Sequence, residues 1–500
     1  LPTTTHAGTQ ASALTDSSVV RFAQTVASIP VFGSHIVVEV GANDELIGVD
    51  AEVASVRGTP TEPSLDAAAA AAKVAELVGV EASEIVAADE PWLVFYSDES
   101  ERWHLAWLLP EVAHAPPDFR DAKPHKGHRS SPRRRNARLD YLVDAHDGEV
   151  LFYYSLTPGA RRGGPPQVPV KCRGRDASAI DQEFYGLAVH GGFELYDPLQ
   201  RTRTYDFRGG DTALDTELPE LAVRSESADF GPENAAAVSA HVNVARVLDF
   251  LRAVLKRNGV DDEGMEVVSI VNCVDSESED PPEWGNAIWW QNKMWYGQQR
   301  VGDALLSYST RLDVIGHELT HGVIEHTSGL IYKNQSGALN ESFADIFGII
   351  IANWYEVGPD SDVGDWSWEF LAGLGEDGGP VRDLSNPKRT GDPDHMDDLY
   401  RGRDDEGGVH VNSNIHNKAA YNVLTARRGS KRVFTPRDVA VLYYLCLMRL
   451  PQAATFKKAL RVLLDVTAMI YSGDAEDAER RVEVVRAAYE KVGITVDEDW

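Results

Sequence analysis

Residues 316–326 read GHELTHGVIEH, and this stretch decides how the rest of the chain is interpreted. Positions i and i+4 of a helix lie on one face, so His317 and His321 would present two imidazole rings to one point. Glu318 is one residue further along, where its carboxylate reaches a water molecule at a metal instead of the metal itself. Two nitrogen ligands and a neighbouring base are what zinc-assisted hydrolysis requires.

Two histidines do not complete a zinc site, and H-E-x-x-H alone also arises by chance. Downstream, NESFADIFG (340–348) places Glu341 and Asp345 four residues apart on a second predicted helix. Glu341 is the predicted third ligand, and Asp345 is predicted to accept the second N–H of a ligand histidine. The alternative is an ordinary exposed acidic face. The apolar neighbours favour burial, however, and a buried carboxylate without a partner is costly.

Composition narrows the classes of protein to consider. The 500 residues are enough for about three domains. The formal net charge of -30 predicts repulsion of nucleic acid and of anionic membranes, while spare carboxylates suit calcium. Cys172, Cys273 and Cys446 form no CxxC pair, which excludes a thiolate zinc site. No apolar run approaches the ~20 residues that span a bilayer, and the longest, 346–355, predicts a buried helix.

The first part of the chain reads mainly as strands. Alternating β-branched runs predict strands on both sides of one helix, which would begin after an N-cap at Ser64 and end at Gly79. HDG at 146–148 predicts the turn of a hairpin. The basic segment 120–138 has two interpretations: a solvated loop, or an electrostatic strap onto an acidic surface.

A Pro- and Gly-rich stretch then divides the chain. It predicts an exposed linker that proteases can reach. Strands dominate after it, with one helix near 233–257, and helices dominate after about 310. The predicted units are 1–75, 76–158, the linker and processing region 159–171, 172–326 and 327–500.

Several longer motifs, in the same order as in the family, resemble thermolysin-like zinc endopeptidases. The resemblance covers about 280–500 and rests on DVIGHELTHGVIEHTSGLIYKNQSGALNESFADIFG (313–348), GNAIWWQNKMWYG (285–297), VRDLSNP (381–387), GDPDHM (391–396) and DDEGGVHVNSNIHNKAAY (404–421). It implies an α+β fold with a two-lobed zincin catalytic domain. A β-rich N-lobe and an α-helical C-lobe would be joined by the active-site helix.

The resemblance also implies roles for individual residues. His317, His321 and Glu341 would bind one zinc ion, and Glu318 would be the general base that activates water. His410 and Tyr332 would stabilise the oxyanion, with Asp405 orienting His410. The substrate-binding residues implied by the resemblance are Asn286, Ala287, Arg382, Leu305, Val314 and Val381.

These substrate-binding residues divide by role. Asn286 and the Ala287 backbone would hold an extended substrate, and Arg382 would bind a substrate carbonyl. The three apolar residues Leu305, Val314 and Val381 would line the main specificity pocket. A bulky apolar residue after the scissile bond is therefore expected.

Calcium is implied by four aspartates that match the family's cluster: Asp313, Asp360, Asp362 and Asp365. Ala352 stands where the family usually has a glutamate shared by two calcium ions, which favours one ion over a pair. Asp313 also has a structural interpretation, because Thr310-x-x-Asp313 is a capping-box pattern for the active-site helix.

The N-terminal 165 residues resemble the propeptides of the same family. IPVFGSHIVVEVGANDELIGV (29–49) is similar to the first propeptide module and RLDYLVDAHDGEVLFYYS (138–155) to the second. The resemblance implies an intramolecular chaperone and inhibitor, cut off near 160–171. It further implies a secreted, monomeric enzyme that acts on peptides and proteins, its signal peptide removed beforehand.

Two other functions remain open from the sequence. The chain could keep this fold and act only as a binding or inhibitory protein, although such a protein has no need of Glu318 and His410 together. It could also be a zinc enzyme of another class, such as an aminopeptidase, which would cleave only at free N-termini.

Overall fold

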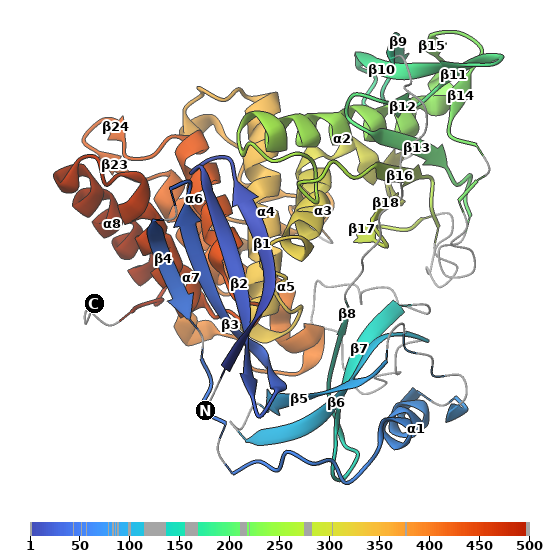
Figure 1. Cartoon of the computed structure of the whole chain (residues 1–500). Coiled ribbons are helices and arrows are strands. Elements are labelled where there is room, and N and C mark those ends of the chain that lie inside the picture. The colour runs from blue at the N-terminus through green and yellow to red at the C-terminus, as the bar shows by residue number, and fades with distance from the viewer. Residues whose placement is uncertain are drawn as a thin grey trace.

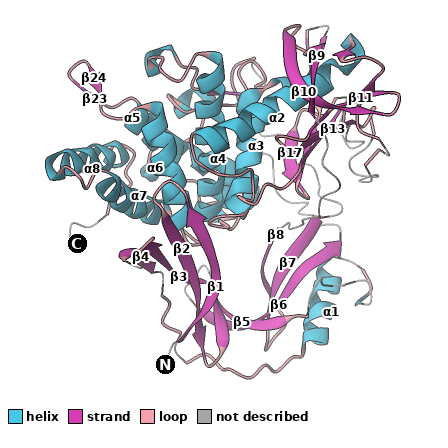
Figure 2. Cartoon of the chain, turned by 45° about the horizontal axis from the view of Figure 1, so that its top comes forward, coloured by secondary structure: helices cyan, strands magenta, loops and turns pink. Residues whose placement is uncertain are grey.

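The computed structural model describes residues 3–496 with four longer gaps and several short ones. The undescribed positions are 115–136, 156–168, 211–217, 275–282 and 44, 52, 57, 79, 83–84, 86, 88–89, 99–101, 220, 303 and 376–377. Figure 1 shows N-terminal strands in blue beside a large helical lobe, with a strand-rich lobe at the upper right. Figure 2 shows most of the helices gathered in one lobe, with α1 apart beside β6, and the predicted α+β class is confirmed.

The N-terminal strands form one eight-stranded sheet that joins both predicted modules. β3 pairs with β2 along one edge and with β4 along the other, and it meets β5 at Val31 and Phe95. The strands are β1 (Thr3–Ser12), β2 (Ser17–Val26), β3 (Ile29–Gly41), β4 (Leu46–Ala51), β5 (Trp92–Ser97), β6 (Trp103–His114), β7 (Ala137–Asp144) and β8 (Val150–Ser155). β7 and β8 form the predicted antiparallel hairpin.

The helix α1 (Ala67–Val78) packs against β6 and β7 through Ala70 and Val74. The boundary predicted at 75/76 therefore falls inside a helix of the second module. The predicted N-cap at Ser64 is wrong. Asp66 accepts a hydrogen bond from the Ala69 N–H at 2.8 Å, whereas the Ser64 hydroxyl lies 2.9 Å from His146.

The strand-rich lobe follows, and it begins earlier than predicted. β9 starts at Pro169, so positions 169–171 form a strand instead of a linker. The elements are β9 (Pro169–Arg175), β10 (Asp181–Val189), β11 (Gly192–Glu194), β12 (Tyr196–Asp197), β13 (Thr202–Asp206), β14 (Arg224–Ser225), β15 (Asp229–Phe230), α2 (Ala235–Ala253), β16 (Val267–Val271), β17 (Ala287–Trp290), β18 (Lys293–Tyr296), β19 (Gln298–Val301) and β20 (Ala304–Ser307).

The helical lobe contains the largest core. Its elements are α3 (Leu312–Glu325), α4 (Asn334–Glu356), β21 (Glu369–Phe370), β22 (Arg382–Asp383), α5 (Asp404–Leu424), β23 (Arg427–Arg428), β24 (Lys431–Arg432), α6 (Pro436–Arg449), α7 (Phe456–Ile470) and α8 (Ala475–Glu490). The apolar run 346–355 lies within α4, mostly buried as predicted. In the described part of the chain, no helix is long and apolar enough to cross a membrane. All three cysteines are buried and unpaired.

Helices α3 and α4 approach closely because glycines face each other where they meet. A Cβ on Gly316 would lie 3.0 Å from the Gly348 Cα, and one on Gly348 would lie 2.5 Å from the Asp313 carbonyl oxygen. The predicted capping box at the start of α3 is wrong, since Thr310 donates to Ser307 and no side chain caps the helix. The close approach brings the α4 carboxylates against the α3 histidines.

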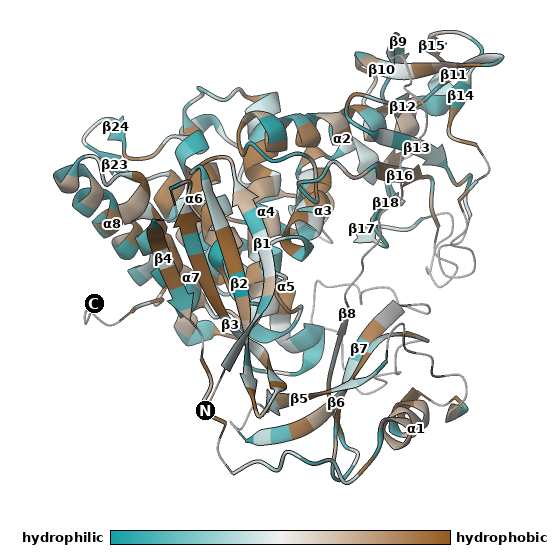
Figure 3. Ribbon diagram, viewed as in Figure 1, coloured by the Kyte–Doolittle hydropathy of each residue, from teal (hydrophilic) through white to brown (hydrophobic). Residues whose placement is uncertain are grey.

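The first module packs on α6 and α7, along a surface that we call the docking seam. Glu39 on β3 forms a buried ion pair with Arg449, and its other oxygen accepts from Ser17 at 2.5 Å. Lys458 and Asp50 pair at 3.1 Å. Hydrophobic stretches on β2 and β3 lie beside the helical lobe in Figure 3, and Val19 and Val37 belong to its core.

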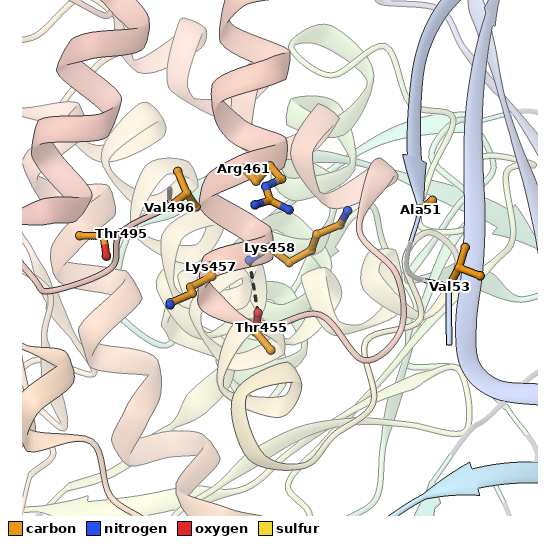
Figure 4. Close-up of a pocket in the computed structure, with 8 residues that line it drawn as sticks. All are labelled: Ala51, Val53, Thr455, Lys457, Lys458, Arg461, Thr495 and Val496. Atoms are coloured by element: carbon orange, nitrogen blue, oxygen red, sulfur yellow. Dashed lines mark hydrogen bonds between the residues drawn. The ribbon is translucent and has the colours of Figure 1, made fainter. Parts of the chain in front are cut away.

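A cavity of ≈ 390 Å³ lies at the edge of this seam (Figure 4). It is lined by Ala51, Val53, Thr455, Lys457, Lys458, Arg461, Thr495 and Val496. None of the predicted site residues lines it. The cavity is therefore a feature of the seam and not of the active site.

Candidate active site

The predicted zinc ligands come together in space. His317 and His321 on α3 and Glu341 on α4 bring their potential ligand atoms within 4.8 Å of one another. The two histidine Nε2 atoms are 3.0 Å apart. Glu341 Oε2 lies 3.5 Å from His317 Nε2, and its Oε1 lies 3.4 Å from His321 Nε2.

The surroundings of these side chains test whether they suit a metal. Asn340 donates its amide N–H to the Leu330 carbonyl, which turns its oxygen toward His321 Nδ1, 2.8 Å away. His317 Nδ1 lies 2.9 Å from Asp345 Oδ1. Each Nδ1 atom lies beside an acceptor oxygen, which favours the ring proton on Nδ1 in both histidines.

It follows that the two Nε2 lone pairs converge on one point. Lone pairs at that separation repel unless a cation lies between them. Glu341 Oε2 is buried and has no hydrogen-bond partner among the described residues. Two neutral imidazoles and one carboxylate are a donor set that zinc prefers, so the residues fit this metal.

Asp345 is held by more than the histidine. Arg382 donates to both of its oxygens, at 2.8 and 2.6 Å. The guanidinium lies 4.5 Å from the Phe370 ring centre, and that ring is 4.9 Å from the His317 ring. The sequence predicted that Arg382 binds substrate, but it did not predict this pairing. Its binding of a substrate carbonyl stays a prediction.

Glu318 is half-buried on the same helix as the histidines. The Trp289 N–H of β17 donates to its carboxylate at 2.8 Å, a contact that the spacing of residues in the sequence does not predict. Burial raises the pKa of Glu318 to about 7, against the opposing influence of nearby His317. A carboxyl group with a pKa near neutrality suits general-base catalysis at physiological pH.

His410, Tyr332 and Asp405 form a second cluster beside Glu341. The Tyr332 hydroxyl donates to Glu341 and lies 3.1 Å from His410 Nε2. Asp405 Oδ1 lies 2.5 Å from His410 Nδ1, and Oδ2 accepts from the His410 N–H at 2.9 Å. Burial opposes protonation of His410, but Glu341 and Asp405 outweigh it and raise its pKa to about 9.

Backbone strain places Asp405. Residues 405–408 all have positive φ at the start of α5, including 55° for Asp405. A Cβ on Gly407 would lie 2.0 Å from the Asn334 side-chain oxygen, so only glycine fits there. This turn folds the Asp405 carboxylate back onto the ring five residues later.

The predicted substrate residues are only partly brought together. Ala287 begins β17, the last strand of its sheet, and Asn286 accepts from the Ala287 N–H at 2.9 Å. Leu305 is 44% exposed on β20, whereas Val314 is buried in the main core. Val381 is half-buried and donates its N–H to Phe370. A shared specificity pocket therefore stays a prediction.

The four predicted calcium ligands do not form one group. Both oxygens of Asp362 accept from Arg427, at 2.5 and 2.6 Å. Asp313 is buried and accepts from the Leu371 N–H at 2.9 Å, while Asp360 and Asp365 are exposed. Within the described ranges, only the His–His–Glu group gathers three such ligand atoms, so calcium binding stays a prediction.

The sequence places Glu325 and His326 at the solvated far end of the active-site helix, but the structure covers this end in part. Glu325 and His326 are half-buried. Trp289 donates its ring N–H to Glu325 at 3.3 Å, and Gln10 of β1 donates to the His326 carbonyl at 3.4 Å. The first module therefore contacts the end of the active-site helix, which local sequence cannot reveal.

Comparisons with known proteins agree with this geometry. Residues 173–325 match the thermolysin metallopeptidase catalytic domain, 328–494 its alpha-helical domain, and 12–53 the fungalysin/thermolysin propeptide motif.

The chain is 30% identical to a thermolysin of Alicyclobacillus acidocaldarius subsp. acidocaldarius, covering 95% of this chain and 83% of that protein. It is 28% identical to a bacillolysin of Bacillus cereus, covering 96% and 83%. A solved precursor of protealysin, a metalloproteinase from Serratia proteamaculans, is 28% identical with a TM-score of 0.49, covering 59% of this chain and 87% of that one. The chain belongs to the thermolysin family and is a zinc metalloendopeptidase with a propeptide.

Proposed function

We propose that this chain is a secreted proenzyme that hydrolyses internal peptide bonds at the centre formed by His317, His321 and Glu341. The two Nε2 lone pairs and the Glu341 Oε2 atom, which has no hydrogen-bond partner among the described residues, gather around one point. This observation carries the proposal. Zinc held there would polarise the substrate carbonyl and lower the pKa of water. The protein's own side chains supply the remaining chemistry.

Glu318 takes the proton from the attacking water and passes it to the leaving amine. The Trp289 N–H holds the carboxylate in place, and a pKa of about 7 lets the group both accept and return a proton. His410 and Tyr332 lie together beside Glu341 and donate to the oxyanion as negative charge develops. Asp405 keeps the His410 ring in orientation.

The substrate would lie along β17, the last strand of its sheet. An extended peptide there pairs with the strand that begins at Ala287, next to Asn286. Arg382 binds a substrate carbonyl in addition to Asp345. The apolar residues Leu305, Val314 and Val381 favour a bulky apolar residue after the scissile bond.

The propeptide inhibits the uncut enzyme by packing beside the oxyanion donors. Ile331, next to Tyr332 in sequence, packs in one hydrophobic cluster with Leu142 and Phe152 of the second module. The Lys333 ammonium lies 4.6 Å from the Phe152 ring centre. Cleavage in 159–171, most of which lies outside the described residues, would release this contact. The mature enzyme would act as a monomer, and one calcium ion would bind near Asp313.

Hydrolysis of casein with and without a zinc chelator tests the zinc dependence of this activity. We expect the chelator to abolish hydrolysis and added zinc to restore it. Equal rates in both samples would rule out the proposed reaction, and cleavage confined to free N-termini would indicate an aminopeptidase.

Glu318→Gln tests the general base. The amide keeps the shape of the side chain but cannot take a proton, so activity should fall by several orders of magnitude while bound zinc stays at the wild-type level. Near-normal turnover would remove Glu318 from this role.

A second variant tests inhibition by the propeptide. Replacing Arg161 and Arg162, which lie in the predicted processing region 159–171, by Ala should slow cleavage and keep activity low. Full activity in an uncut chain would show that the N-terminal half does not inhibit.

A further inference from the structure

A chain of buried polar side chains runs from α6 and α8 to the active-site helix. All six members are at most 1% exposed. The successive contacts are Tyr443 Oη to Tyr489 Oη (3.2 Å), Tyr489 Oη to His416 Nε2 (2.8 Å), His416 Nδ1 to Ser342 Oγ (2.7 Å), Ser342 Oγ to Asn417 Oδ1 (2.6 Å) and Asn417 Nδ2 to Asp345 Oδ2 (2.8 Å). Asp345 then faces His317, so the chain ends on a predicted zinc ligand.

The direction of every hydrogen bond in this chain is determined. A carboxylate can only accept, so Asn417 must turn its NH₂ to Asp345 and its carbonyl oxygen to Ser342. Ser342 therefore donates to Asn417 and accepts from His416 Nδ1–H. Burial lowers the pKa of His416 to about 3, which keeps the ring neutral, and its Nε2 then accepts from Tyr489.

This order matters because Asn417 has two possible orientations. A rotated amide would turn its oxygen toward the Asp345 carboxylate and repel it. The Ser342 hydroxyl, held by His416, satisfies the amide oxygen only in the orientation that donates to Asp345. Arg382 also donates two hydrogen bonds to the Asp345 carboxylate, but these bonds do not fix the orientation of the Asn417 amide.

We propose that Ser342 and His416 are positioning residues for the zinc ligand His317, acting through Asn417 and Asp345. The inference rests on the proposed zinc centre. The chain holds the Asp345 carboxylate beside His317 Nδ1, which favours the ring proton on Nδ1 and leaves Nε2 free to bind metal. Hydrogen-bond partners of ligand histidines set the orientation and basicity of the ring. Ser342 and His416 lie in the helical core and influence the His317 ring through the two intervening side chains, Asn417 and Asp345.

Ser342→Ala in the full chain tests this proposal. The readout is the zinc dissociation constant, measured by competition with a chromophoric chelator, together with the absorption spectrum of the cobalt-substituted protein. We expect the constant to rise on the order of tenfold, the low end for losing a ligand's hydrogen-bond partner. The cobalt spectrum should shift, and kcat should fall with KM unchanged.

Ser239→Ala is the matched control. Ser239 is also a buried helical serine, 2% exposed on α2, and it donates to the Ala235 carbonyl and accepts from the Ala177 N–H. The Ser239→Ala variant should be less stable than the wild type but should bind zinc with the same affinity. Tyr489→Phe removes only the hydroxyl that donates to His416 and keeps the shape of the side chain. It should also raise the zinc dissociation constant, but by less than Ser342→Ala.

The outcomes separate this inference from the proposed function. Wild-type zinc affinity and cobalt spectra in both Ser342→Ala and Tyr489→Phe would show that the chain is only structural and would overturn the inference. If Ser342→Ala does not fold, Tyr489→Phe decides alone. Failure of the unaltered protein to bind zinc would instead contradict the proposed zinc centre.

Discussion

At the scale of single residues, Asp405 shows how backbone strain positions a side chain of the candidate site. Four consecutive residues with positive φ are unfavourable, since only glycine adopts this region freely, and two of the four are not glycine. The turn brings both Asp405 oxygens onto His410, one on the ring and one on the backbone N–H.

Asp405→Asn should therefore reduce kcat without a matching change in KM. The amide removes the charge that stabilises protonated His410, and the loss should reach up to about 10²-fold, the lower figure for losing an oxyanion donor outright. Steady-state kinetics on a peptide substrate measure it, with bound zinc as the control. An unchanged kcat would mean that His410 needs no carboxylate partner.

At the scale of elements, the crossing of α3 and α4 decides whether the proposed zinc ligands can come together. His317 and Glu341 are on different helices, and only the glycine contact lets these helices come close enough. Since the contact involves backbone atoms, no side-chain rotation can relieve an added methyl group.

Gly348→Ala should destabilise the protein by about 1–3 kcal/mol through overpacking. Its Cβ would meet the Asp313 carbonyl oxygen at 2.5 Å. Urea unfolding measures the change, and zinc affinity should fall as well because the helices separate. Gly473→Ala is the control, since nothing lies within 4 Å of its Cβ and no loss is expected there. Equal stability of the two variants would contradict the packing argument.

The second module contains a pH-sensitive contact. His104 on β6 lies 2.7 Å from Asp144 and 3.2 Å from Asp98. Burial opposes protonation of the ring, but the two carboxylates outweigh it and raise the pKa of His104 above its usual 6.5. Its contribution to stability is therefore complete below pH 6.5 and is lost as the pH rises through the raised value.

Thermal unfolding of the uncut chain at a series of pH values checks this prediction. Wild type should lose stability relative to His104→Gln as the pH rises from 6.5, and the two should converge at higher pH. A difference that stays constant over this range would show that protonation of His104 does not support the fold.

At the scale of the whole molecule, the docking seam joins the propeptide to the enzyme's helical core. The Glu39–Arg449 pair is buried between β3 and the end of α6, and Arg21 donates to the Leu450 carbonyl at 3.2 Å. The pair joins residues 410 positions apart, so it forms only when both parts are folded. It fixes where the first module sits on the helical lobe.

Glu39→Leu should cost about 3–5 kcal/mol of unfolding free energy in the uncut chain, because it leaves Arg449 buried without its partner. The double variant Glu39→Leu with Arg449→Met should recover most of that loss. Glu183→Leu is the control, since the Arg173–Glu183 pair is exposed and contributes little. Additive losses in the double variant would show that the two side chains do not depend on each other.

The sequence by itself determined the parts of the site that depend on local periodicity. The four-residue spacing of His317 and His321, and of Glu341 and Asp345, predicted which side chains share a helical face, and the structure brings them together. The hairpin before residue 155 followed from its turn residues in the same way. The overall α+β class was implied by the resemblance to thermolysin-like endopeptidases, and the strand and helix patterns, which repeat every two and every 3.6 residues, agree with it.

Only the tertiary structure decided the contacts between distant residues. Arg382 pairs with Asp345 across 37 positions, and Arg427 with Asp362 across 65, and neither spacing leaves a periodic signal. The covered end of α3 was missed for the same reason, because the first module reaches it only after the chain folds back. Which polar groups become buried, and with which partners, is set by how the helices and sheets pack, and that packing is not written in any local stretch of sequence.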